Sequence, residues 1–362
     1  MTTGALLVNL GTPASPRVGD VRRYLREFLG DPLVIDLPAL PRRLLLECVI
    51  LPFRPRRSAE AYAKIWSDRG SPLLVHGRAL RDALAARLGP GLPVELGMRY
   101  GEPSIRRAGE RLRQAGATRI LVLPLFPQYS SAATGSALRR VRECLGEGGV
   151  EVVREHFHDA PGFVSSWAAV AGPRLRSFRP DFALLSYHGL PERQIRRLDP
   201  GGGHCLVRED CCERIGPANR RCYRAQCFGT SRALAAALGL SGDRVATSFQ
   251  SRLGRTPWIR PYTDLLLPEL RARGVSRLAV LCPSFVADCL ETLEEIGIRA
   301  RQQWQDLGGE ALCLVPCLNA EPEWAACVAG WIREAAAAQT GASSAAAATP
   351  EASASETATP PR

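Results

Sequence analysis

Eight short apolar runs, most of them rich in β-branched residues, recur along the chain. Between most of them lie amphipathic stretches rich in Ala, Arg and Leu, such as Ser104–Gln114 and Ser231–Leu238. This alternation is typical of parallel β-sheets with helices on both faces, so the sequence predicts an α/β fold. The predicted strands are Ala5–Val8, Val94–Met98, Ile120–Leu125, Glu151–Arg154, Phe182–Ser186, Arg244–Ser248, Leu278–Cys282 and Leu312–Val315.

The predicted strands form two groups of four, separated near residues 159–172. A local similarity between Leu121–Pro127 and Leu278–Phe285 is consistent with two similar α/β halves that face each other. The C-terminal tail is almost entirely Ala, Ser, Thr, Pro and Glu, which cannot bury a core, so we expect it to be disordered. We predict a first half at 1–158, a second half at 159–317, a helix at about 318–338 that packs back on the first half, and a disordered tail at 339–362.

Residues 30–57 depart from this pattern, because they are rich in Leu, Ile and Pro and carry flanking arginines. The segment is either an ordinary helix packed on the first sheet or an exposed apolar lip. Such a lip would contact a greasy ligand or a membrane surface. The sequence leaves both interpretations open.

The charge balance narrows the class of partner only slightly. The chain of 362 residues has a formal net charge of +11, from 47 Lys and Arg against 36 Asp and Glu. The basic residues are spread out rather than clustered with aromatic residues, which argues against nucleic-acid binding. An anionic small substrate and an acidic membrane surface fit the same balance equally well.

We expect a cytoplasmic protein, monomeric by default, with transient contact at the inner face of the membrane as the alternative. The N-terminus passes directly into a strand-like run, and no apolar run approaches the ~20 residues that cross a bilayer. Twelve cysteines without a secretory leader then favour reduced thiols or metal ligands over disulfides.

A histidine marks the end of the predicted strand Phe182–Ser186. The run continues as Ser186-Tyr187-His188-Gly189-Leu190-Pro191, and ligands in open α/β sheets bind at the carboxyl ends of such strands. His188 is therefore a candidate for chemistry, although this segment alone fits an ordinary structural histidine equally well.

A group of carboxylates follows the predicted strand Leu278–Cys282. If a helix begins near Asp288, then Asp288, Glu291 and Glu295 share one of its faces. A solvated acidic face is the alternative interpretation. The position at the carboxyl end of a parallel strand would bring these side chains near His188.

Five segments resemble motifs of the ferrochelatase family and occur in the family's order. They are Leu7–Pro13, Phe126–Ser130 with Thr134–Ser136, Ser186–Pro191, Phe249–Gly254 and Asp288–Leu293, and the resemblance covers roughly residues 5–330. The resemblance implies two Rossmann-like domains with a porphyrin cleft between them. It also implies insertion of ferrous iron into a porphyrin to make haem, and neighbouring enzymes of the haem pathway are then an alternative to the membrane surface as a transient partner. Similarity to proteobacterial enzymes around Asp288–Glu295 favours protoporphyrin IX over coproporphyrin as the substrate.

The resemblance also assigns roles to single residues. It makes His188 the base and iron ligand, Glu291 the acidic residue opposite it, and Asp288 and Glu295 a carboxylate path for iron or protons. A neutral imidazole can accept a proton near pH 7, and imidazole and carboxylate hold Fe²⁺ weakly enough to release it. Arg22, Arg23 and Arg26 are either partners of the propionates or, as we favour, a solvated helix face. The residues expected to line the porphyrin are Leu10, Tyr129, Ser130, Thr134 and Tyr187.

The segment 199–228 departs from the common family pattern by its cysteines. Cys205, Cys211, Cys212, Cys222 and Cys227 lie within it, among glycines and charged residues. Zinc sites usually contain a CxxC unit, which is missing here, whereas a [2Fe–2S] cluster needs four cysteines at varied spacing. The segment resembles the internal cluster insert of some bacterial ferrochelatases. A [2Fe–2S] cluster is the favoured interpretation, and zinc or unligated thiols remain open.

We predict that Cys205, Cys211, Cys212 and Cys222 ligate the cluster, because they belong to the insert. Cys227, like Tyr223, matches a residue of relatives that lack the cluster. Adjacent cysteines are awkward ligands, so Cys227 in place of Cys211 or Cys212 is the alternative. The other cysteines are expected to be small buried hydrophobic residues: Cys48, Cys144, Cys282, Cys289, Cys313, Cys317 and Cys327.

Two other functions remain open from the sequence. One is a cobalt or nickel chelatase with the same fold and a site of histidine and carboxylates. The other is a haem-binding or iron–sulfur redox sensor built on a chelatase scaffold, although the presence of both His188 and Glu291 argues against a lost activity.

Overall fold

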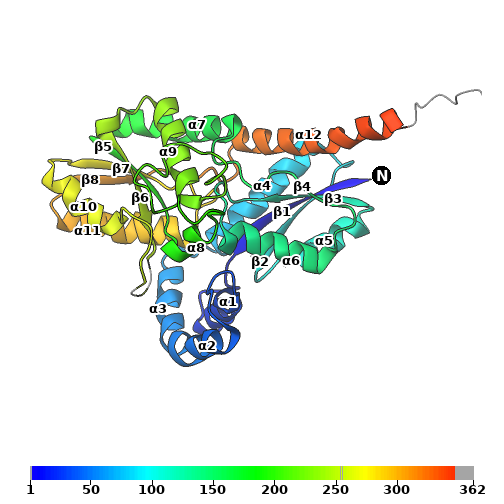
Figure 1. Cartoon of the computed structure of the whole chain (residues 1–362), viewed down its shortest axis with the longest axis horizontal. Coiled ribbons are helices and arrows are strands. Elements are labelled where there is room, and N and C mark those ends of the chain that lie inside the picture. The colour runs from blue at the N-terminus through cyan, green and yellow to red at the C-terminus, as the bar shows by residue number, and fades with distance from the viewer. Residues whose placement is uncertain (1, 253, 255, 347–362) are drawn as a thin grey trace, which may run out of the picture.

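Two parallel four-stranded sheets form the centre of the computed structural model, which describes residues 2–252, 254 and 256–346 (Figure 1). The first sheet has the order β2-β1-β3-β4 and the second has the order β6-β5-β7-β8. The predicted α/β class, with two similar sheets flanked by helices, is therefore confirmed. The strands are β1 (Thr3–Gly11), β2 (Val94–Tyr100), β3 (Arg119–Pro124), β4 (Val150–Val152), β5 (Phe182–His188), β6 (Val245–Gln250), β7 (Arg277–Leu281) and β8 (Ala311–Leu314).

The eight strands match the eight apolar runs, with ends that differ by a few residues. In each half the first strand pairs with the second and the third, so the two sheets repeat one topology. The helices of the first half are α1 (Val18–Gly30), α2 (Ala39–Leu44), η1 (Leu45–Ile50), α3 (Leu51–Ala63), α4 (Pro72–Leu88), α5 (Ile105–Gln114), η2 (Ser131–Gly135) and α6 (Ser136–Leu145). The helices that follow are α7 (Pro161–Phe178), α8 (Glu192–Arg196), α9 (Tyr223–Leu238), η3 (Gly242–Arg244), α10 (Thr263–Ala272), η4 (Glu291–Ala300), α11 (Arg301–Asp306) and α12 (Pro322–Ala346).

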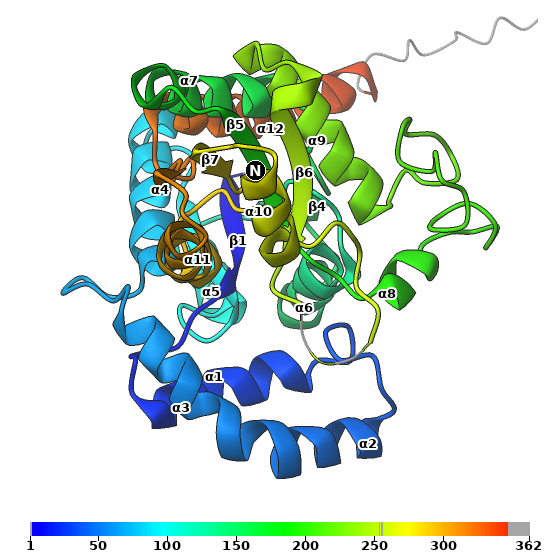
Figure 2. The same ribbon diagram turned by 90° about the vertical axis from the view of Figure 1, so that its left-hand side faces the viewer.

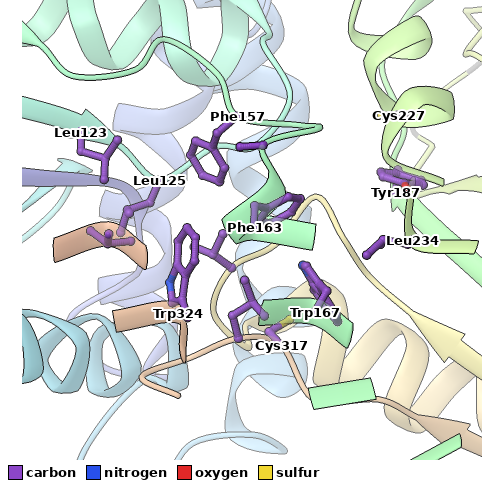
Figure 3. Close-up of a cluster of buried hydrophobic side chains, with 14 of the residues drawn as sticks. Leu123, Leu125, Phe157, Phe163, Trp167, Tyr187, Cys227, Leu234, Cys317 and Trp324 are labelled. Atoms are coloured by element: carbon purple, nitrogen blue, oxygen red, sulfur yellow. The ribbon is translucent and has the colours of Figure 1, made fainter. Parts of the chain in front are cut away.

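One hydrophobic core is continuous across both sheets. At its centre Phe157 lies 5.6 Å from Trp324 and 5.3 Å from Phe163, measured between ring centroids (Figure 3). These rings come from the loop after β4, from α7 and from α12, so the segment that joins the halves and the C-terminal helix share one aromatic cluster.

Helix α12 packs against α4 of the first half and α7 of the second half. It extends past the expected end at residue 338, and alanine-rich sequence favours such an extension. Residues 347–362 of the expected disordered tail lie outside the described residues.

Helices α1, α2, η1 and α3 form a layer that projects from the first half (Figure 2). Its inner face has its own hydrophobic cluster, which includes Tyr24, Leu46 and Tyr62. Its outer face exposes large apolar side chains, namely Leu40, Leu44, Val49 and Phe53, with Phe53 73% exposed. The exposure favours the lip interpretation of residues 30–57.

The outcome for the isolated cysteines is mixed. Cys282, Cys289 and Cys317 are buried as predicted, and Cys144, Cys313 and Cys327 are partly buried. The prediction is wrong for Cys48, which lies exposed in η1 next to Val49. Within the described ranges, no helix is both long and apolar enough to cross a membrane.

Candidate active site

Loops from the carboxyl ends of both sheets meet between the two halves. Gln128, after β3, donates a hydrogen bond of 3.4 Å to the carbonyl of Pro283, after β7. Leu10 at the end of β1 and Leu290 after β7 pack against the same hydrophobic cluster. Parallel sheets place ligand-binding loops at such edges.

His188 is the last residue of β5, and its ring is held in a defined state. Its Nδ1 lies 2.6 Å from the carbonyl oxygen of Gly189. Because a carbonyl only accepts hydrogen bonds, Nδ1 carries the proton, and a neutral ring then has its free lone pair on Nε2. Ser284 Oγ accepts from the His188 amide at 3.1 Å, and the Tyr223 hydroxyl donates to the His188 carbonyl at 2.9 Å. The histidine is therefore fixed from three sides with one basic nitrogen available.

The acidic segment differs from its prediction. A π-helix, η4, begins at Glu291, so Asp288 precedes the helix and the three carboxylates do not share one α-helical face. Asp288 is buried and accepts from Asn319 Nδ2 at 2.8 Å and Thr292 Oγ1 at 3.0 Å. Those partners fix the loop after β7 against the segment after β8. The sequence missed the π-helix, because its i→i+5 hydrogen bonds leave no distinct pattern of apolar residues.

Glu295 accepts hydrogen bonds from residues at the end of β6. It accepts from the Ser251 amide at 2.8 Å and from Gln250 Nε2 at 3.4 Å. Gln250 is the register partner of His188 in the sheet and also donates to the Glu291 carbonyl at 2.8 Å. Gln250 thus links the strand position of His188 to the first turn of η4 and to Glu295, a role that no motif in the sequence revealed.

Glu291 lies within electrostatic range of side chains from helices α1 and α3. Burial is the main cause that raises the pKa of Tyr24 and of Tyr62, and the nearby charge of Glu291 raises both further. Burial lowers the pKa of the half-buried Arg54, and Glu291 opposes that shift. The carboxylate of Glu291 is therefore close enough to two phenols and a guanidinium to affect the pKa of each. Sequence reasoning missed all three, because nothing distinguished Arg54 from the many other arginines.

The arginines that the sequence offered as propionate partners already have partners of their own. Arg22 donates to the carbonyl of Leu51 at 2.8 Å, and Arg23 pairs with Asp20. Arg26 binds Glu47 through two bonds of 2.8 and 2.9 Å. These contacts favour the solvated helix face.

The expected porphyrin-lining residues divide into two sets. Leu10 is partly buried. Tyr129 and Ser130 are largely buried in the loop after β3, where Ser130 caps η2 by accepting from the Ala133 amide. Tyr187 does not fit its predicted role: it is fully buried and bonds to Ser231 Oγ at 2.9 Å. Neighbouring residues of a strand point to opposite faces, so Tyr187 points away from the face of His188. Thr134 is also fully buried.

Four of the five clustered cysteines come together. The sulfurs of Cys211 and Cys212 lie 3.7 Å apart, and the neighbouring thiol of Cys222 affects the pKa of both Cys205 and Cys212. All four side chains are buried. Burial is the main cause that raises the pKa of Cys205 and of Cys211, and the neighbouring thiol of Cys222 is the main cause for Cys212.

Cys227 lies in α9, where burial raises the pKa of its thiol and Tyr223 opposes that shift. The turns that carry the four thiols are held by polar residues that the sequence did not single out: Asp199 accepts from the Cys205 amide at 2.8 Å, and Asn219 donates to the Cys211 carbonyl at 2.7 Å. Across the residues that the structure describes, no three His, Cys, Asp or Glu side chains surround a single metal position.

Comparison with known proteins agrees with this arrangement. The model of the ferrochelatase family matches residues 2–336. The ferrochelatase of Coxiella burnetii (strain RSA 493 / Nine Mile phase I) is 50% identical over 326 residues, which cover 90% of this chain and 92% of that protein. The ferrochelatase of Azotobacter vinelandii (strain DJ / ATCC BAA-1303) is 50% identical over 329 residues, covering 90% and 96%.

Among solved structures, the chain is similar to SirB from Bacillus subtilis with Fe³⁺, with a TM-score of 0.51. The alignment covers 94% of this chain and 98% of that chain at 13% sequence identity. At such low identity the likeness concerns the fold alone.

Proposed function

Since the chain belongs to the ferrochelatase family and inserts ferrous iron into protoporphyrin to form haem, we propose that His188 and Glu291 carry out this reaction. The observation that carries the proposal is the bond from His188 Nδ1 to Gly189, which leaves Nε2 as a fixed proton acceptor. With the family established, we retain neither the cobalt or nickel chelatase nor the redox sensor as an alternative.

Metallation releases both pyrrole N–H protons as the metal–nitrogen bonds form. In our proposal His188 Nε2 takes these protons in turn, and Glu291 transfers protons or Fe²⁺ at the same site. Glu295 and Gln250 line a hollow of about 220 Å³ together with Ser251 and Arg299, which offers a polar way out to solvent. Asp288 supports the loop through Asn319 and Thr292.

Glu291→Gln tests the second part of this proposal. We expect kcat for haem formation to fall by about 10²-fold, with a smaller change in the KM for protoporphyrin, because general acid–base groups act on turnover. Glu310→Gln, which removes an exposed carboxylate paired with Arg277, is the matched control. A variant that weakens only the KM for porphyrin would contradict a role of Glu291 in transfer.

We propose that Arg54 binds an acidic group of the porphyrin, with Leu10, Tyr129 and Ser130 along the ring. Arg54 is half-buried beside Glu291 and, among the described residues, makes no ion pair, so an incoming carboxylate would compensate its burial. Arg54→Met should raise the KM for porphyrin by about tenfold, a typical loss for one charged hydrogen bond. Arg56→Met, whose side chain is exposed and paired with Glu60, should leave it unchanged.

For the cysteine segment we propose a [2Fe–2S] cluster held by Cys205, Cys211, Cys212 and Cys222. Each iron of such a cluster takes two thiolates, so paired thiols suffice where a single metal ion would need three or four around one point. Two thiolates ~2.3 Å from a tetrahedral metal lie ~3.8 Å apart, close to the separation of Cys211 and Cys212. The cluster, when bound, supplies a one-electron redox centre and cross-links the turns of the segment.

The visible absorbance of the purified protein tests this cluster. Cys205→Ser and Cys222→Ser should remove the chromophore, while Cys48→Ser and Cys327→Ser should keep it. Zinc without sulfide in the purified protein would overturn the iron–sulfur proposal. If Cys227→Ser loses the chromophore and Cys211→Ser or Cys212→Ser keeps it, Cys227 is a ligand in place of the cysteine whose variant keeps the chromophore.

We further propose that the lip contacts an anionic membrane surface. Leu40, Leu44, Val49 and Phe53 are exposed on it, and Arg42, Arg43, Arg56 and Arg57 lie in the same segment. Phe53→Asp should reduce binding to vesicles containing phosphatidylserine and leave metallation of soluble porphyrin unchanged. Equal binding of wild type and Phe53→Asp to these vesicles would contradict the proposal.

A further inference from the structure

The residues on either side of Cys222 contact both loops of the proposed active site. Tyr223, directly after it, donates to the His188 carbonyl at 2.9 Å. Gln226, one turn later in α9, accepts from the Tyr129 amide at 2.6 Å and donates to the Arg220 carbonyl at 2.8 Å. A proposed cluster ligand thus directly precedes the residues that hold the histidine loop and the porphyrin-lining loop.

Arg221, directly before Cys222, contacts side chains rather than backbone groups. Its guanidinium binds both carboxylate oxygens of Glu155, at 2.8 and 2.7 Å. The same group lies over the ring of Tyr129, 5.1 Å from the centroid. A planar guanidinium can pair with a carboxylate and cover an aromatic ring at once, which a lysine cannot do equally well.

The position of Arg221 depends on its neighbour. Residues 200–221 form turns and bends, and the apolar side chains of Val207 and Ile215 are exposed, so little apolar packing fixes this segment. The buried thiols and the hydrogen bonds of Asp199 and Asn219 hold it instead. Cys222 is also the N-cap residue of α9, so any ligand of its sulfur fixes the backbone next to Arg221.

We propose that Arg221 is a positioning residue that couples occupancy of the cysteine cluster to the setting of Tyr129 and thereby to porphyrin binding. The inference rests on the proposed function, in which Tyr129 lines the porphyrin and Cys222 ligates a cluster. Glu155 holds the other side of the guanidinium, on the segment that joins the two halves.

Arg221→Ala tests the positioning role against Arg220→Ala, a control with the same loss of charge at the next residue. The Arg220 side chain is exposed and lines a surface hollow with Ile215 and Pro217. We expect Arg221→Ala to raise the KM and the fluorescence-measured Kd for protoporphyrin about three- to fivefold, with kcat nearly unchanged. Arg221→Lys should restore only part of the affinity, and the melting temperature should match that of Arg220→Ala. Equal KM values in the two alanine variants would overturn the positioning role.

The coupling is tested by combining variants. Cys205→Ser should raise the Kd for porphyrin in the wild-type background but add nothing in the Arg221→Ala background, because the path is already broken. If the fold-changes in Kd from Cys205→Ser and Arg221→Ala multiply in the double variant, the two residues act independently and the coupling is wrong. The chromophore should persist in Arg221→Ala, which separates this variant from a lost cluster.

Two results separate failure of this inference from failure of the proposed function. If Tyr129→Ala leaves the Kd for porphyrin unchanged, the proposed lining role of Tyr129 is wrong. If Tyr129→Ala weakens binding and Arg221→Ala does not, the lining role stands and the inference about Arg221 is wrong.

Discussion

His158 should make the stability of the protein depend on pH. The residue is buried in the segment after β4, and burial lowers its pKa from 6.5 to about 4. His156 lies beside it, with the two Nδ1 atoms 3.3 Å apart, a distance at which one neutral ring donates its Nδ1–H to the Nδ1 lone pair of the other. The fold therefore opposes a positive charge on His158.

The lowered pKa of His158 determines the direction and the size of the change in stability with pH. Between pH 6.5 and pH 4 the unfolded state binds a proton on this residue that the folded state does not, so stability falls as the pH falls. The full contribution is present above pH 6.5. With these two pKa values, the loss between pH 8 and pH 5 is about 2 kcal/mol.

Urea unfolding at pH 8 and pH 5 measures this loss. Between pH 8 and pH 5 the free energy of unfolding of the wild-type protein falls by the contribution of His158 and by those of other groups. For His158→Gln this fall should be about 2 kcal/mol smaller. His204→Gln, a histidine outside this pair, should behave as wild type. An equal loss of stability in wild type and His158→Gln would show that protonation of His158 does not destabilise the fold.

Three further predictions concern single contacts. Tyr223→Phe removes the hydroxyl that bonds to the His188 carbonyl, so kcat should fall about fivefold to tenfold while porphyrin affinity, followed by fluorescence, stays constant. Trp324→Ala opens the aromatic core that the two halves share and should cost about 3–5 kcal/mol in urea unfolding. Gly11→Ala should fold poorly and melt at a lower temperature, since a Cβ there would lie 1.9 Å from the Tyr100 carbonyl oxygen at a φ of +119°.

The features that could be predicted from the sequence are those set by residues close to one another along the chain. Buried parallel strands are short apolar runs, so β5 and its terminal histidine could be placed directly, and the density of cysteines marked the segment around Cys211. The burial of Tyr187 could also have been predicted, because residues of a strand alternate between faces and His188 is its neighbour.

The rest depends on contacts between distant segments. Asp288 is fixed by Asn319 and Glu295 by Ser251, which the sequence does not bring together. Arg54 acquires its significance only because the lip folds its α3 helix toward Glu291. The π-helix arises where tertiary contacts outweigh the α-helical preference of the segment.

Haem formation by His188→Ala, measured beside protoporphyrin binding by the same protein, shows whether His188 accepts the pyrrole protons. We expect that metallation with Fe²⁺ is lost while the Kd for porphyrin and the melting temperature stay near those of wild type. His188→Asn, whose side-chain amide can still donate to the Gly189 carbonyl but has no basic nitrogen, should be equally inactive. Near-normal turnover in either variant would contradict the assignment of His188 as the proton acceptor.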